Sequence, residues 1–359
     1  MHWIALLAAI LALVLARLFR APAKSRFFPG LLWFTASLLV CTFAIRIATQ
    51  SADITRPTDY DRFVAYAAQQ VREEPDTPFA VFVGASYTRN GIDDEALTRR
   101  LRAEGYPHRV INLSLEGASL QERDAHLWQF MHMTGMAPDA VFLEVSDLYD
   151  HNPAYVFEVG KFSDRAIEQF DPNSTYWTLK GLAQGQCHGT ADCVKDWVLM
   201  KAHILLNFVN IGILSTGETV DEIAPSPAFD PQDQPRDTFT WQSEEISAAL
   251  TEPLVIQAEE GPAWARLFRH DQRRRLQEAG VRQIAYYYPP VLEPLDRAYV
   301  ADLCAGELSE FPCIAPVDEM LLSQLEGDVW FDHEHLLREG AELYTAWLAA
   351  EIQSRGALQ

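Results

Sequence analysis

The distribution of hydrophobic residues divides the chain into an apolar start and a longer remainder in which short apolar segments alternate with polar ones. Two uncharged, mostly apolar runs open the sequence, from Trp3 to Ala16 and from Phe27 to Ala44. A bilayer core needs roughly 20 apolar residues per helix. The runs therefore predict a membrane anchor of two transmembrane helices over residues 1–48, followed by a juxtamembrane segment over 49–76.

Basic residues lie between the two runs. Arg17, Arg20, Lys24 and Arg26 are all in this loop, and no Lys or Arg precedes Trp3. By the positive-inside rule the loop faces the cytoplasm and the rest of the chain is exported. We therefore expect a protein of the bacterial inner (cytoplasmic) membrane whose folded domain lies in the periplasm or on the extracellular face. A cleaved signal peptide is the alternative, but the first run lacks a basic segment before it and a second run follows at once.

Beyond residue 76 the pattern alternates between strands and helices. Apolar segments typical of buried strands are Phe79 to Val83, Arg109 to Leu113, Ala140 to Val145 and Gln283 to Tyr288. Helical periodicity marks Asp93 to Glu104, Leu120 to His132 and Pro262 to Ala279, and a polar juxtamembrane helix around Asp59 to Arg72 precedes them. This alternation predicts a three-layer αβα domain with a parallel sheet over 77–355. Residues 150–254 break the alternation, and we expect them to form an insertion over the active site.

Composition narrows the possible partners. With a formal net charge of -21, the chain lacks the clustered cations that a nucleic acid partner requires, so none is expected. Four cysteines form two close pairs, Cys187 with Cys193 and Cys304 with Cys313. In an oxidising compartment they predict two local disulfides, although four cysteines allow three connectivities and free thiols are the alternative.

One candidate nucleophile is a serine at the end of a predicted strand. The segment Val81 to Val83 runs directly into Gly84-Ala85-Ser86, where the carboxyl end of a parallel strand would present a hydroxyl to a ligand. We expect the glycine to allow a tight turn. Gly-x-Ser recurs at residues 117–119, but Ser119 is followed by Glu122 in the pattern of a helix capping box. Ser86 is therefore the better candidate, with a structural turn serine as the alternative.

A second motif near the C-terminus supplies a base. Asp332 and His335 are three residues apart, a spacing that puts both side chains on one face of a helical turn. A serine hydroxyl needs a histidine to take its proton and a carboxylate to orient that histidine. Two alternatives stay open: Asp332 could only cap a helix over 334–352, or Asp332, His333 and His335 could bind a metal.

The order of these motifs resembles the SGNH (GDSL-type) hydrolase superfamily over about residues 77–355. The resemblance implies an αβα fold and acyl-ester chemistry by Ser86, His335 and Asp332, with no cofactor. It also implies an oxyanion hole formed by the backbone N–H groups of Ser86 and Gly117. Two departures from the family pattern are present. Residues 84–87 read Gly-Ala-Ser-Tyr where the family has Gly-Asp-Ser-Leu, and no Gly-x-Asn-Asp follows the third predicted strand. Asn152 is the nearest candidate for the oxyanion-hole asparagine.

An SGNH-like domain held outside the membrane by N-terminal helices is similar to the DltD and alginate O-acetylation proteins. That resemblance implies that Ser86 accepts an acyl group, in the first instance acetyl, from a membrane-bound O-acyltransferase partner. The acceptor would be an envelope polysaccharide, another glycopolymer or a lipid-linked glycan. Two other functions use the same fold: a carbohydrate or lipid acyl esterase, and a catalytically inactive envelope assembly protein.

Overall fold

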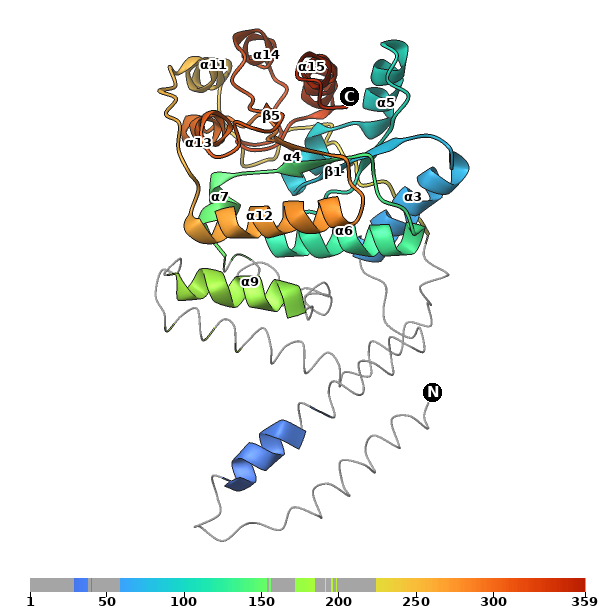
Figure 1. Cartoon of the computed structure of the whole chain (residues 1–359). Helices are drawn as coiled ribbons and strands as arrows, with labels where there is room; N and C mark the ends of the chain where they lie inside the picture. The colour runs from blue at the N-terminus through green and yellow to red at the C-terminus, as the bar shows by residue number, and fades with distance from the viewer. Residues whose placement is uncertain are drawn as a thin grey trace. The chain divides into compact units, whose positions relative to one another are not determined.

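The computed structural model describes residues 29–37, 40, 59–153, 155, 172–184, 191, 195, 198 and 224–358 (Figure 1). The chain divides into one unit of residues 1–58 with 198–223 and a second of 59–197 with 224–359. The first predicted transmembrane run lies outside the described residues, and of the second only residues 29–37 and 40 are described, as helix. Among the residues described, no helix is long and apolar enough to cross a bilayer.

A parallel sheet forms the centre of the second unit. Its strand order is β2-β1-β3-β4-β5, and every neighbouring pair is parallel. Both β1 and β3 are buried at all five positions, as expected for central strands covered on both faces. The strands are β1 Phe79–Val83, β2 Arg109–Asn112, β3 Ala140–Glu144, β4 Gln283–Tyr287 and β5 Cys313–Ile314. The four predicted strands are confirmed, and β5 was missed because two residues show no alternation.

Helices cover both faces of this sheet, so the predicted α/β class is confirmed. Alternate residues of β1 point to opposite cores: Val81 and Val83 to one, Ala80 and Phe82 to the other. Figure 1 shows α5, α11, α14 and α15 on one side and α3, α6 and α12 on the other. The helices are α3 Asp59–Glu73, α4 Ser86–Gly91, α5 Asp94–Ala103, α6 Leu120–Thr134, α7 Asp147–His151, α9 Pro172–Ala183, α11 Ser243–Thr251, α12 Ala263–Glu278, α13 Pro294–Ala305, α14 Glu319–Gln324 and α15 Arg338–Ser354.

Local capping groups fix several helix ends. Ser119 and Glu122 form the predicted capping box at the start of α6, and this helix ends at Gly135 with φ 67°. The predicted start of the last helix was wrong: α15 begins at Arg338, four residues after the expected position. Residues 332–335 form a separate turn before it.

A disulfide ties the edge strand to the neighbouring helix. Cys304 near the end of α13 is bonded to Cys313 of β5, with the Cα atoms 5.4 Å apart. This is one of the two disulfides that the cysteine spacing predicts. The Cys187 and Cys193 pair lies outside the described residues.

A buried ion pair joins α6 to the carboxyl end of β3. Arg123 Nη1 lies 2.9 Å from Glu144 Oε1, and the two side chains are only 3% and 0% exposed. The guanidinium of Arg123 also lies over the ring of Tyr149, 4.4 Å from its centroid. Removing water from two charges is costly, so each depends on the other remaining in place.

Arg123→Met is expected to lower the free energy of unfolding by about 3–5 kcal/mol, because it leaves the Glu144 carboxylate buried without its cation. Urea unfolding of the full-length protein measures this loss. The matched control is Arg274→Met, which removes exposed ion pairs to Asp271 and Glu278 on the surface of α12. The control should lose about 1 kcal/mol or less. Equal losses in both variants would contradict the role given to the buried pair.

Candidate active site

Ser86 is the first residue of α4, directly beyond the carboxyl end of β1. It is half-buried, and its backbone N–H precedes the first hydrogen bonds of the helix. The residues on each side of it are held by Glu144. The Ala85 N–H donates to Glu144 Oε2 at 3.0 Å, and the Thr88 hydroxyl donates to the same oxygen at 2.5 Å. The buried carboxylate therefore fixes the turn that carries the candidate nucleophile.

Gly84 has a different role from the predicted one. Its backbone does not have positive φ, so no special turn conformation requires a glycine. Instead, a Cβ atom at this position would overlap the Thr88 side chain and Glu144 Oε2. The glycine is needed because the Thr88 side chain and the Glu144 carboxylate both approach the backbone closely at the end of β1.

Asp332 and His335 are hydrogen-bonded to one another. His335 Nδ1 lies 2.8 Å from Asp332 Oδ1, and the same oxygen accepts the backbone N–H groups of Glu334 and His335 at 3.0 Å each. With a carboxylate as partner, Nδ1 carries the proton in the neutral ring and Nε2 is left as an acceptor. The segment is not helical: the bonds from the two backbone N–H groups to the Asp332 carboxylate close a local turn before α15. The side-chain pairing does not depend on a helix.

A third residue, Arg236, contacts the other oxygen of Asp332. Its Nη1 lies 3.2 Å from Oδ2, and its guanidinium lies over the ring of Phe331, 4.8 Å from the centroid. Burial raises the pKa of Asp332, but the hydrogen bond and charge of His335, the Glu334 N–H and the charge of Arg236 outweigh it. The net result is a pKa below the usual value, so the carboxylate is ionised at neutral pH.

An aromatic stack brings the two motifs together. The ring of Tyr87 stacks on the ring of His335, with centroids 5.3 Å apart and planes at 16°. Tyr87 is itself packed edge-on against Tyr149 and Tyr288 and is almost fully buried. Tyr87 follows Ser86 directly in the chain, so the candidate base packs against the residue next to the candidate nucleophile.

The two other predicted oxyanion-hole residues occupy turns. Gly117 has φ 59° in the turn between β2 and α6, a conformation that favours glycine. Asn152 ends α7, where its N–H donates to the Leu148 carbonyl and its carbonyl accepts from the Tyr155 N–H. Its backbone is thus used in that turn, and the roles of both residues in an oxyanion hole stay predictions.

Residues 224–242, called the strap below, connect the two halves of the site. They belong to the predicted insertion over 150–254 and directly precede α11. The strap residue Asp230 forms an ion pair with Arg89 of α4, and its carbonyl accepts from the Asn90 side chain. Further along, the Arg236 N–H donates to the Phe331 carbonyl. One segment thus contacts both the nucleophile helix and the turn that holds His335.

Sequence reasoning missed four residues that shape this site: Thr88, Arg123, Glu144 and Arg236. A charged residue at the end of an apolar strand was the available signal for Glu144, because parallel strands rarely bury a charge without a partner. No local pattern marks Arg236, which reaches Asp332 from a distant segment. The alternative of a metal site gains no support within the described ranges, where no group of three or more His, Cys, Asp and Glu could hold a metal ion.

No protein-family model matches the chain, and a search of curated proteins also found no match.

Asp332→Asn is expected to lower the free energy of unfolding by about 1–3 kcal/mol near pH 7, because a neutral amide replaces an ionised acceptor. Since the pKa of Asp332 is lowered in the folded protein, its stabilising contribution is present above its unfolded pKa of about 3.9 and is lost as the pH falls through the folded pKa. Urea unfolding near pH 7 and near pH 3 should show the difference from wild type shrinking at low pH.

The control for this comparison is Asp328→Asn. Asp328 is exposed, and within the described residues it forms no ion pair. Its replacement should change stability by about 0.5 kcal/mol or less at either pH. A difference for Asp332→Asn that is the same at both pH values would be inconsistent with an ionised, hydrogen-bonded carboxylate.

Proposed function

We propose that this chain is a serine-nucleophile enzyme of acyl-ester chemistry, of the SGNH hydrolase type, that transfers an acyl group to an envelope glycan. One observation carries the proposal: His335 is hydrogen-bonded to Asp332 and stacked on Tyr87, the residue next to Ser86. A carboxylate, an imidazole and a serine in this order form the arrangement that activates a hydroxyl for attack on a carbonyl.

The chemistry then follows in two half-reactions. His335 Nε2 takes the proton of the Ser86 hydroxyl while Oγ attacks the acyl carbonyl carbon, and the donor oxygen leaves with that proton. In the second half, His335 takes the proton of an acceptor hydroxyl, which attacks the acyl-serine. The Ser86–acyl bond breaks and the proton returns to Ser86. Asp332 keeps the imidazole oriented and balances its charge in both halves.

Transfer and hydrolysis differ only in the acceptor, so the choice between them rests on the sequence. The predicted membrane anchor and the predicted export would put the site beside envelope glycans and a membrane-bound O-acyltransferase. An acyl esterase in which water is the acceptor is the second candidate, since the half-buried Ser86 is partly open to solvent.

Wild-type protein is expected to react with a fluorophosphonate probe, which bonds to an activated serine and releases fluoride. Ser86→Ala should abolish labelling, and His335→Ala should slow it by at least about a thousandfold. Intact-protein mass spectrometry measures the added mass. Ser119→Ala is the matched control, because Ser119 belongs to the other Gly-x-Ser copy and caps α6. It should keep wild-type labelling.

Turnover of an acetyl ester then separates the two candidates. Slow release of acetate that accelerates when a glycan acceptor is added indicates transfer, whereas fast release to water indicates an esterase. A folded wild type that neither labels nor releases acetate would refute the enzymatic proposal and would favour an assembly protein.

A further inference from the structure

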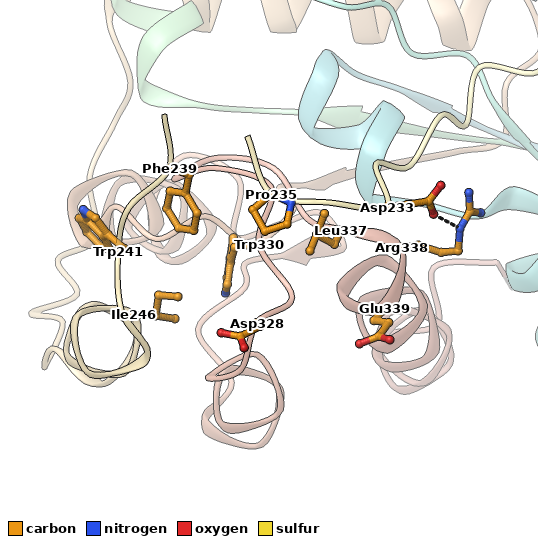
Figure 2. A pocket seen from close by; sticks show the side chains of 10 residues that line it. All are labelled: Asp233, Pro235, Phe239, Trp241, Ile246, Asp328, Trp330, Leu337, Arg338 and Glu339. Carbon is orange, nitrogen blue, oxygen red and sulfur yellow. Dashed lines mark hydrogen bonds and ion pairs between the residues drawn. The ribbon is translucent and has the colours of Figure 1, made fainter. Parts of the chain in front are cut away.

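A cavity of about 500 Å³ lies under the strap, beside the turn that holds His335. Figure 2 shows three aromatic rings at one end of it and the ion pair between Asp233 and Arg338 at the other. Its size falls in the usual range for small-molecule sites, about 300–1,000 Å³. The residues that line it are Asp233, Pro235, Phe239, Trp241, Ile246, Asp328, Trp330, Leu337, Arg338 and Glu339.

The cavity combines ring faces with carboxylates. Phe239 and Trp241 come from the strap and are only half-buried, whereas Trp330 behind them is 1% exposed. Half-buried rings offer faces against which the C–H side of a sugar can pack, while carboxylates accept hydrogen bonds from its hydroxyl groups. This mixture of stacking surfaces with a few polar groups suits a hydroxyl-rich ligand better than a purely apolar one.

The charges of the cavity restrict the ligand further. Arg338 neutralises Asp233. The Arg338 Nε donates a hydrogen bond to Asp233 Oδ1 at 2.7 Å, and this bond and the guanidinium charge hold the pKa of Asp233 below its usual value. Asp328 and Glu339 are exposed and have no ion-pair partner among the described residues. The wall is therefore net negative, and like charges facing each other disfavour binding. A uronate, phosphate or sulfate polymer would meet this repulsion, and an uncharged saccharide would not.

Aromatic residues of the cavity contact the loop that carries the candidate base. The Trp241 and Phe239 rings pack edge-on against His333, with centroids 4.5 Å and 5.2 Å away, and His333 follows Asp332 in the chain. Trp330 lies two residues before Asp332. From this arrangement, and resting on the proposed function, we infer that the cavity is a binding subsite for an uncharged saccharide, which holds the acceptor glycan beside the acyl-serine.

Isothermal titration of the full-length protein tests this inference with two probes, a β-1,4-linked glucose hexamer and a β-1,4-linked mannuronate hexamer. The glucose hexamer is expected to bind with a millimolar or lower Kd, at least about tenfold more tightly than the uronate. Trp241→Ala should weaken it by about tenfold. Tyr176→Ala is the control, because Tyr176 is an exposed aromatic on α9 that does not line the cavity. It should bind as wild type does.

The paired substitution Asp328→Asn with Glu339→Gln tests the charge argument. It should bring the affinity for the uronate to within about threefold of that for the glucose hexamer, because the repulsion is gone. Far-ultraviolet circular dichroism and thermal unfolding establish that each variant is folded. No binding of the glucose hexamer to wild type at millimolar concentration, equal binding of the uronate, or no effect of Trp241→Ala in a folded variant would each overturn the inference.

Ser86→Ala separates this inference from the proposed function. The variant should bind the glucose hexamer as wild type does, because Ser86 does not line the cavity. Binding in a wild type that fails to label with the fluorophosphonate would leave the saccharide site standing and remove the catalytic proposal. Labelling of a wild type that does not bind the glucose hexamer would leave the catalytic proposal standing and remove the saccharide site.

Discussion

The carboxylate of Glu144 is the constraint on which the site depends. One of its oxygens accepts from the backbone of Ala85 and the hydroxyl of Thr88, and the other is paired with Arg123. The pair lies where neighbouring strands β1 and β3 end, which is where the connections of an open α/β sheet diverge and ligands usually bind. A group this deeply buried is stable only with all its partners present, so α6, β3 and the Ser86 turn are held in one arrangement.

The other half of the site is the turn of residues 332–335, which contacts the candidate catalytic residues through Asp332 and the cavity rings through His333. Asp332 is held by its own backbone neighbours, by His335 and by Arg236 of the strap. The next residue, His333, packs against the aromatic rings of the cavity. The rings of the cavity therefore pack on the same short loop that orients the imidazole.

The features that could be predicted from the sequence are those that depend on residues close together in the chain. Buried strands such as β1 and β3, and the capping box of Ser119, depend on residues within a few positions and were predicted. Asp332 and His335 could be paired in advance because they are three residues apart. By contrast, the contact of Glu144 with Ala85 spans 59 residues, and that of Arg236 with Asp332 joins two distant loops. The purpose of Gly84 was misjudged because the space beside it is filled by the folded positions of the Thr88 side chain and of Glu144 from β3.

The close approach at Gly84 has an evolutionary consequence. Residues 84, 88 and 144 fill one small volume at the end of β1, so a change at one of them alters the space available to the other two. A larger residue at 84 would require a shorter side chain at 88 or 144 in the same sequence. Related chains should therefore change at these three positions together. That joint variation offers a fingerprint for distant relatives whose overall similarity has become too low to detect.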